Sequence, residues 1–436
     1  MVSVQELRRD AHTGASIALY WAVTRAYSIL GDPAGLLETS SELTSFADTL
    51  RGEPLVRSRG GMYYTADYDV CSSILRSPLA SADIPEPRNL LESLLIGPLP
   101  PEEQISPLLD GIVVKDGDEH TRIRRLVQPA FTHRVMQSWR EAAQKVAAEL
   151  VEGFPRSGEV DLVADWAAPL PMAVICEILG VPFDDRATFT EWGNTLAEGL
   201  DRARSLGHAR AMNAASQELV AYLSELLAER RRNPEDDLLS ALATAELDGD
   251  VLTDRDIVAT SAFLLIAGFE TTVNLLGEGT RVLLEHPDQL AAVAADPDLV
   301  PGMVEEALRF VSPVQFTFRT ALGPIELPGD ALLDTRQTVV LLLCGANRDP
   351  AVFADPNSFD IYRDNARRHL ALGFGIHHCL GAALARMEAE VAWGALFARY
   401  PDTSAWRLAG EPVPNPGRMI HGLRSLPMRL GTRVPA

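Results

Sequence analysis

Cysteine is scarce in this sequence, and its few copies lie far apart. The 436 residues include four cysteines, at positions 71, 176, 344 and 379, and no two of them form a C-x-x-C pair. This spacing argues against a disulfide framework or a zinc ribbon and suits a reducing cytosol. Basic residues are outnumbered by acidic ones, 39 to 60, which gives a formal net charge of −21. Nucleic acid is therefore excluded as the default partner, because a phosphate backbone needs Lys and Arg to replace its counterions.

Long apolar runs are also missing. The run at 16–30 is broken by Arg25, and the run at 257–267 is interrupted by Thr260 and Ser261. Neither reaches the roughly 20 apolar residues that cross a bilayer, and no export signal is recognisable. We therefore expect a cytoplasmic protein without a membrane span.

Helical periodicity dominates what is present. Apolar residues recur at three- and four-residue steps, which predicts helices, and short apolar runs between Gly, Pro and charged turns predict strands. The expected helices are 133–154, 165–180, 208–232, 254–285, 300–311 and 382–400. The expected strands are 54–64, 323–328 and 337–344, and the expected long irregular loops are 85–109 and 349–366. The pattern predicts a mainly α fold with small β-sheets, and loops of that length are more often functional than idle.

The segment 373–386 carries the strongest chemical signal. Its glycines allow a tight bend, and the Ala-Leu-Ala-Arg run that follows is a strong helix former. Cys379 therefore sits just before a helix N-terminus, where free N–H groups and the helix dipole favour a thiolate. On the residues alone, Cys379 is a haem ligand, a zinc ligand, a nucleophile paired with histidine, or a structural cysteine. Zinc would need more ligands than the adjacent His377 and His378 can supply.

The same segment resembles the haem-binding loop of the cytochrome P450 family, Phe-Gly-x-Gly-x-His/Arg-x-Cys-x-Gly. The chain reads LGFGIHHCLG at 372–381, so only the first position departs from the pattern. Leu372 keeps an apolar cover but loses the aromatic ring, which affects the expected redox tuning and not the ligation. The resemblance implies a P450 fold with the haem between this cysteine loop and a long central helix. The residues it assigns to the haem here are Gly373, Phe374, His377, Gly381 and, as the iron ligand, Cys379.

The long central helix is predicted from an N-cap at Thr253, with Asp256 three residues later. Up to about residue 285 it would span roughly 45–50 Å at about 1.5 Å per residue. Its centre reads AGFETT at 267–272. A mid-helix glycine costs about 1 kcal/mol against alanine, and a carboxylate is expensive to bury. On the residues alone, this is either a packing crossover with Glu270 reaching solvent or a notch for a ligand.

This centre is similar to the family's Ala/Gly-Gly-x-Asp/Glu-Thr motif. The resemblance implies that Ala267 and Gly268 line the cofactor. It also implies that Thr271 hydrogen-bonds dioxygen and that Glu270 helps to relay protons from solvent.

Two charged groups also resemble family features. Glu306 and Arg309, on one helix face, are similar to the family's Glu-x-x-Arg, which Arg363 would complete as a buried network behind the haem. The two haem propionates need cationic donors. By the same resemblance these donors are His120, Arg124, Arg319 and His377. Each of them, taken alone, is equally consistent with a solvated basic residue.

The walls of the substrate pocket are implied by the resemblance as well. They are the loop 85–114 with Phe263, Ile266, Ala267, Val314, Gln315, Thr317, Met419 and Ile420. Core packing is the alternative for the apolar members. Because this wall is mainly apolar with one amide, at Gln315, we expect a largely hydrophobic ligand with a polar handle, such as a polyketide, terpenoid or peptide-derived intermediate.

The resemblance covers about residues 50–430. We expect a single P450 domain over 1–436, with a helical N-terminal extension at about 1–45 and no reductase domain. It implies haem b (iron protoporphyrin IX), with electrons passing from NAD(P)H through a ferredoxin reductase and a ferredoxin. The implied reaction is a monooxygenation, a hydroxylation or epoxidation in secondary metabolism, on a substrate that is free or bound to a carrier protein. The alternatives are peroxide-driven oxidation, oxidative coupling and a non-catalytic, partner-recruiting module.

Clustered arginines indicate where an acidic ferredoxin would dock on the thiolate side, although two solvated basic faces are the alternative. They are Arg122, Arg124, Arg125, Arg134 and Arg140, together with Arg367 and Arg368 before the cysteine loop. Their attraction for an acidic partner should fall as salt rises.

Overall fold

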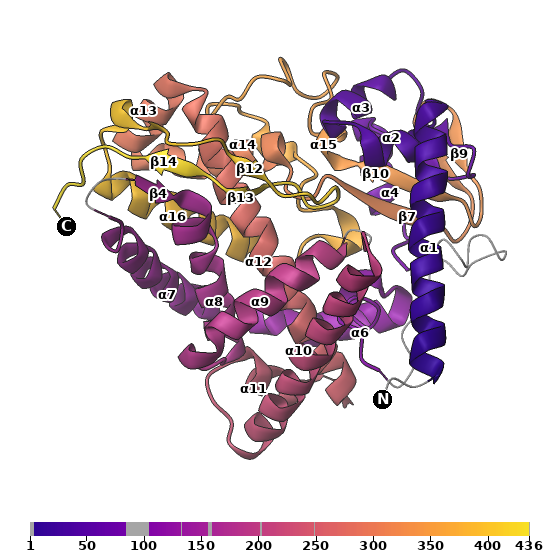
Figure 1. The fold of residues 1–436 in the computed structure, drawn as a ribbon, viewed down its shortest axis with the longest axis horizontal. Helices are drawn as coiled ribbons and strands as arrows, with labels where there is room; N and C mark the ends of the chain where they lie inside the picture. Colours follow the sequence, from indigo (N-terminus) through magenta and orange to yellow (C-terminus); the bar gives the residue numbers. More distant parts are fainter. Residues whose placement is uncertain are drawn as a thin grey trace.

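The computed structural model describes residues 4–83, 104–131, 133–155, 159–200, 203–247 and 249–435. Its helices are α1 (Val4–Ile29), α2 (Pro33–Thr39), α3 (Leu43–Thr49), α4 (Tyr68–Arg76), α6 (Gly117–Val127), α7 (His133–Glu152), α8 (Pro169–Leu179), α9 (Arg186–Ala197), α10 (Leu206–Arg232), α11 (Leu238–Ala243), α12 (Asp254–Leu284), α13 (Pro287–Ala295), α14 (Val300–Val311), α15 (Leu343–Ala346) and α16 (Ala382–Arg399). Its strands are β1 (Val56–Arg57), β2 (Tyr63–Thr65), β3 (Ala80–Ser81), β4 (Glu159–Asp161), β5 (Glu246–Leu247), β6 (Asp250–Val251), β7 (Phe316–Ala321), β8 (Ile325–Leu327), β9 (Ala331–Leu333), β10 (Thr338–Leu342), β11 (Arg407–Leu408), β12 (Val413–Pro414), β13 (Leu423–Ser425) and β14 (Pro427–Arg429). The mainly α architecture with small sheets agrees with the prediction (Figure 1).

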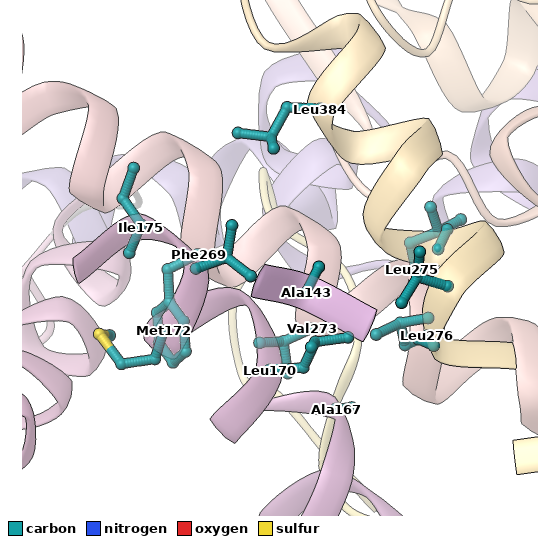
Figure 2. Packing of buried hydrophobic residues seen from close by; sticks show 14 of the residues in the cluster. Ala143, Ala167, Leu170, Met172, Ile175, Phe269, Val273, Leu275, Leu276 and Leu384 are labelled. Atoms are coloured by element: carbon teal, nitrogen blue, oxygen red, sulfur yellow. The ribbon is translucent and has the colours of Figure 1, made fainter. Parts of the chain in front are cut away.

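The central helix α12 organises the molecule. It begins with the predicted capping box, in which Thr253 Oγ1 accepts from Asp256 N (3.1 Å) and Asp256 Oδ2 accepts from Thr253 N (3.0 Å). It packs against α8, α9, α10 and α16. Figure 2 shows its Phe269 and Val273 within the main hydrophobic cluster. Among the described residues, α12 alone is long and apolar enough to cross a membrane, but 67% of its most apolar window is buried, so its apolar character serves the core.

The largest sheet lies beside the N-terminal helices (Figure 1). Its strand order is β1-β2-β10-β7-β3, with β10 parallel to β2 and antiparallel to β7. Leu43 and Phe46 of α3 are buried in one cluster with Tyr64 and Val340 of this sheet. The N-terminal helices α2 and α3 are therefore packed into the body of the fold.

The six predicted helices are confirmed within a few residues as α7, α8, α10, α12, α14 and α16. The start of α8 moves from 165 to 169 because a π-helical turn occupies 163–167. The segment 349–366 is irregular as expected. Most of the predicted loop 85–109 lies outside the described residues.

The strand predictions hold less well. The single strand expected at 54–64 is an antiparallel hairpin of β1 and β2, because the chain reverses around Gly61, whose φ is +89°. The strand expected at 323–328 is shortened to β8. The strand expected at 337–344 ends at Leu342, where the short helix α15 begins. The longest strand, β7, was not predicted.

Candidate functional site

The cysteine loop is a tight turn that leads into α16. Gly373 and Gly375 have φ of +67° and +69°, which glycine adopts without strain. A Cβ at Gly375 would lie 2.3 Å from Leu75 O, so only glycine fits against α4. Cys379 N donates to Leu372 O (2.8 Å), and α16 begins three residues after this cysteine, with Gly381 as its N-cap. The predicted local geometry is present.

Cys379 differs from the other three cysteines because it is half-buried, whereas they are fully buried. Burial still raises the pKa of Cys379, against the opposing effects of Gly381 N–H, Arg124 and Arg386. The Gly381 N–H at the start of α16 lowers the pKa, as the sequence argument expects, and burial opposes it. A metal ion bound at the sulfur would favour the thiolate, because a coordinating metal deprotonates a thiol. The described residues contain no group of three or more His, Cys, Asp or Glu side chains that could hold a metal ion.

The middle of α12 carries an open stripe in an otherwise buried helix. Between Ile257 and Leu283 the partly exposed residues are Phe263, Leu264, Ala267, Gly268, Thr271 and Arg281. All but the last follow four-residue steps along one face. A Cβ built on Gly268 would meet no atom within 4 Å. Open space therefore lies against this face, where the sequence predicts the oxygen notch.

Glu270 is turned away from solvent and held by two amides. Its side chain is 8% exposed, and Oε1 accepts from Asn274 Nδ2 (3.3 Å) and Asn415 Nδ2 (2.6 Å). Burial raises its pKa, against the lowering effect of these two hydrogen bonds. The packing-crossover alternative with Glu270 in solvent is therefore wrong. Thr271 Oγ1 donates to Ala267 O (2.7 Å), so its oxygen lone pairs remain available to accept.

A second buried carboxyl group lies next to the notch, and the sequence argument missed it. Glu388 of α16 is 3% exposed and lies 3.3 Å from Thr272 Oγ1, which also lies 3.1 Å from Gly268 O. One hydroxyl proton cannot serve both acceptors. Burial raises the pKa of Glu388 to about 8 despite the bond from Thr272. A neutral Glu388 that donates to Thr272 Oγ1, while Thr272 donates to Gly268 O, satisfies both contacts.

The predicted propionate partners gather around Asp116. The rings of His120 and His377 lie 4.4 Å apart, and His377 Nε2 lies 3.0 Å from Asp116 Oδ1. His120 Nε2 is buried and has no hydrogen-bond partner among the described residues. Burial, followed by the charges of His377 and Arg124, lowers the pKa of His120 to about 4. Bonds from His377 and Ser81 outweigh burial and lower the pKa of Asp116 to about 2.

The two arginines of this group are short of acidic partners. Arg319 is 7% exposed, and burial lowers its pKa to about 10. It donates to Thr317 Oγ1 (3.3 Å) and Phe318 O (2.8 Å), and it forms no ion pair within the described part of the chain. Arg124 Nη2 donates to His378 O (2.7 Å). These donors suit a ligand that brings its own carboxylates.

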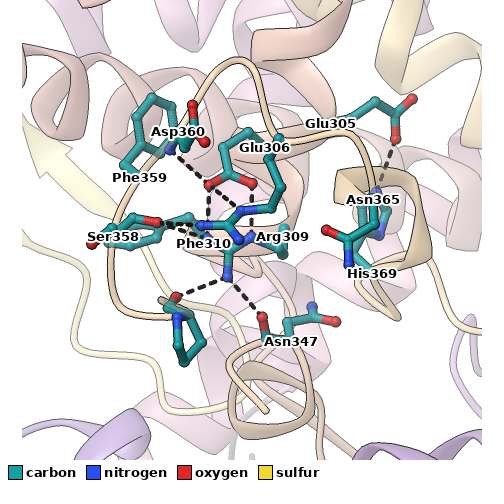
Figure 3. Close-up of polar contacts among 12 residues, drawn as sticks. Glu305, Glu306, Arg309, Phe310, Asn347, Ser358, Phe359, Asp360, Asn365 and His369 are labelled. Atoms are coloured by element: carbon teal, nitrogen blue, oxygen red, sulfur yellow. Dashed lines mark hydrogen bonds and ion pairs between the residues drawn. The ribbon is translucent and has the colours of Figure 1, made fainter. Parts of the chain in front are cut away.

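Glu306, Arg309 and Arg363 form the expected buried network, of which Figure 3 shows Glu306 and Arg309. Arg309 binds both carboxylate oxygens of Glu306 at 2.7 Å, and Arg363 Nε lies 3.2 Å from Glu306 Oε1. Arg309 also donates to the carbonyl oxygens of Asn347 (2.9 Å), Pro356 (2.9 Å) and Ser358 (3.0 Å). The network therefore fixes the irregular segment that precedes the cysteine loop.

A neighbouring charge cluster extends this support to the loop itself. Glu305 accepts hydrogen bonds from His369 Nε2 (3.1 Å) and Arg386 Nε (2.7 Å). These contacts join α14 to α16 and to the segment before the loop. Bonds from His369 and Arg386 outweigh burial and lower the pKa of Glu305 to about 2. Figure 3 shows the Glu305–His369 contact beside the Glu306 network.

The predicted pocket residues meet only in part. Val314 pairs with Ile420 in a β-bridge, and Gln315 N donates to Met419 O (2.8 Å), so these two segments lie together. Ile266 is 5% exposed in the main core cluster, as the core-packing alternative expects.

The structure changes the view of Gln315. Its Nε2 donates to Val311 O (3.0 Å) and Ser312 O (2.6 Å), so both amide protons are already used. Only Oε1 of this amide is left for a ligand, as an acceptor, so the expected polar handle would be a hydrogen-bond donor.

The cysteine loop also reaches the surface beside a basic groove. Phe374 and Ile376 are 37% and 51% exposed. A groove of about 510 Å³ is lined by Phe374 and, among others, by Arg76, Arg367 and Arg368. Arg76 stacks 4.2 Å from the centre of the Phe374 ring and was missed from sequence.

Among the other predicted docking arginines, Arg125 is exposed, Arg124 donates to His378 O (2.7 Å), and two more form ion pairs. Arg122 pairs with Asp256 (2.9 Å), and Arg140 pairs with Glu390 (3.0 Å). The side chain of Arg134 lies outside the described part of the structure.

The residues present fit haem. An open helix face, a half-buried cysteine, an unpartnered buried imidazole nitrogen and a buried arginine without a carboxylate are what an iron porphyrin with two propionates requires. His120, Arg124, Arg319 and His377 would hold the propionates.

Comparison with known proteins agrees with this fit. The sequence model described as cytochrome P450 matches residues 101–401. The chain is 40% identical over 372 residues to cytochrome P450 monooxygenase PikC of Streptomyces venezuelae, covering 84% of this chain and 85% of that protein. It is 40% identical over 332 residues to 6-deoxyerythronolide B hydroxylase of Saccharopolyspora erythraea, covering 76% and 80%. The crystal structure of P450BioI in complex with hexadec-9Z-enoic acid ligated acyl carrier protein is similar with a TM-score of 0.80 and 31% identity, covering 91% and 99%.

Proposed function

This chain belongs to the cytochrome P450 family and is a monooxygenase, and we propose that it hydroxylates or epoxidises a largely hydrophobic, polyketide-like small molecule. The observation that carries the proposal is the open face of α12 at Ala267, Gly268 and Thr271, within a helix that is otherwise buried. We place this activity in the cytoplasm. Haem, when bound by Cys379, supplies the activation of dioxygen.

The residues around this face would deliver the protons that oxygen activation consumes. Glu270 is buried, its pKa is raised, and both amide bonds fall on Oε1, so the other oxygen is left to take up and release a proton. A general acid works best when its pKa lies near the working pH. The Thr271 hydroxyl donates its hydrogen bond to Ala267 O, so its oxygen lone pairs are left to accept a hydrogen bond from the reacting group. Glu270 therefore transfers the proton, and Thr271 orients the reacting group that receives it.

The substrate assignment rests on the pocket wall and on the relatives. The available surface at Phe263, Val314 and Met419 is apolar, which suits a hydrophobic ligand. One relative is named as a 6-deoxyerythronolide B hydroxylase, and P450BioI has been crystallised with an acyl carrier protein. These support a polyketide-like substrate that is free or attached to a carrier.

We propose that electrons come from NAD(P)H through a ferredoxin reductase and an acidic ferredoxin. The exposed Phe374 lies in one groove with Arg76, Arg367 and Arg368, and the exposed Ile376 follows two residues later on the same loop. An apolar centre with a charged rim is the usual anatomy of a protein interface. Cys379 lies three residues after Ile376 on the same loop, which gives electrons a short path.

Oxygen-isotope labelling tests the reaction. The haem-loaded protein, a ferredoxin, its reductase and NADPH are incubated under ¹⁸O₂ with a macrolactone that shifts the iron spin state. The product should gain one ¹⁸O atom, and Thr271→Ala should divert more of the consumed oxygen to hydrogen peroxide. A product without ¹⁸O, or one formed equally well with peroxide alone, would overturn the proposal in favour of peroxide-driven chemistry.

A further inference from the structure

One arginine fastens the segment 104–114 to the start of α12. Arg255 Nε donates to Asp110 Oδ1 (3.1 Å), and Nη2 donates to Asp110 Oδ2 (2.9 Å) and to Gln104 O (2.9 Å). A planar guanidinium forms two parallel hydrogen bonds with a carboxylate, a bidentate geometry that lysine cannot reproduce. The two side chains are 39% and 18% exposed, so solvent screens the pair only in part.

Asp110 also closes a turn within the segment. Its Oδ2 accepts from Ser106 N (2.7 Å), and its own N donates to Ser106 O (2.9 Å). Gln104 Nε2 donates to Asn213 Oδ1 on α10 (3.2 Å). The turn is therefore a small rigid unit attached to both α12 and α10.

The position of Arg255 calls for an explanation. It lies in the first turn of α12, where the positive end of the helix dipole disfavours a cation. Pairing with Asp110 supplies the reason for an arginine there.

The same unit lies against the open stripe of α12. A Cβ on Gly111 would come within 3.3 Å of the Phe263 side chain and within 2.3 Å of Pro107 O. Phe263 is eight residues, or about 12 Å, along α12 from Arg255. The far end of the segment is fixed at Asp116, which accepts from Ser81 Oγ (2.5 Å). The Arg255–Asp110 pair therefore controls how closely the segment lies on Phe263, without reaching the cavity itself.

We propose that Arg255 and Asp110 are positioning residues that hold segment 104–114 over Phe263 and thereby set which sizes of ligand the cavity over the haem accepts with full affinity. This inference rests on the proposed function, because the cavity in question is the haem cavity. A large ligand contacts the held segment and benefits from its being ordered in advance. A small ligand that reaches only the iron does not.

Spectral titration of the haem-loaded protein tests the inference with two probes, imidazole and the bulky triaryl imidazole clotrimazole. In Arg255→Gln and in Asp110→Asn, the dissociation constant of clotrimazole should rise about five- to tenfold, while that of imidazole changes less than twofold. The double variant should lose less than the sum of the two single variants, because each single variant already removes the Arg255–Asp110 interaction. In the wild type, added salt should weaken clotrimazole binding, whereas in Arg255→Gln it should not.

Arg281→Gln is the matched control, since Arg281 pairs with Glu285 (2.6 Å) at the other end of the same helix. It should leave both dissociation constants unchanged. Equal changes in the two dissociation constants, or no change in that of clotrimazole, would overturn the proposed role of Arg255 and Asp110. If neither probe perturbs the haem spectrum of the wild type, the proposed function itself fails.

Discussion

The buried carboxyl group of Glu388 gives a quantitative prediction about stability and pH. Its pKa is raised from 4.5 to about 8 in the folded protein, chiefly by burial. Between these values the unfolded chain ionises while the folded chain keeps its proton, so stability falls as pH rises. At about 1.4 kcal/mol per pH unit, the loss between pH 4.5 and pH 7 is about 3 kcal/mol, and it stops growing above pH 8.

Glu388→Gln removes this titration and keeps an amide that can donate to Thr272 Oγ1. Chemical unfolding of matched haem-loaded proteins at pH 5, 7 and 8 should therefore show a flatter dependence for the variant, with its advantage growing toward pH 8. Glu390→Gln, two residues further along α16 and half-exposed, is the control and should follow the wild type. Equal slopes for Glu388→Gln and the wild type would refute the assignment of a neutral carboxyl group.

Two further predictions concern the haem surroundings. Arg309→Lys should cost about 3–5 kcal/mol in unfolding experiments, because one ammonium group cannot bind Glu306 and three carbonyl oxygens together and leaves buried acceptors unpaired; a cost below 1 kcal/mol would contradict the role of the network. Arg319→Gln should speed haem transfer to apomyoglobin about tenfold or more, because a charge-assisted bond to a propionate is lost, whereas Arg186→Gln at the surface should not; unchanged transfer would remove Arg319 from the haem site.

The features that could be predicted from the sequence are those whose residues lie close together in the chain. The cysteine loop, the AGFETT centre of α12 and the Glu306–Arg309 pair each lie within a few residues, so their resemblance to family motifs is visible in the sequence alone. Long amphipathic helices such as α7 and α10 were predicted from their apolar periodicity, which is likewise local. The strand β7 was not predicted, since its charged Arg319 interrupts the apolar pattern.

The residues that were missed meet across the chain. Asn415 binds Glu270 from 145 residues away, and Glu388 meets Thr272 across 116 residues. Asp116 meets His377 across 261 residues. No local pattern marks such contacts, because they follow from how α12, α16 and the C-terminal hairpin pack. The use of Gln315 as a donor to α14 carbonyls was likewise visible only in the fold.

The central claim is that the sulfur of Cys379 binds haem iron. The most direct measurement is the carbon-monoxide difference spectrum of the reduced, haem-loaded protein, compared with that of Cys379→Ser. A thiolate ligand predicts a Soret band far to the red of a histidine-ligated haem in the wild type, and the loss of that band in the variant. A wild-type spectrum of the histidine kind, or a red-shifted band that survives in Cys379→Ser, would contradict the account.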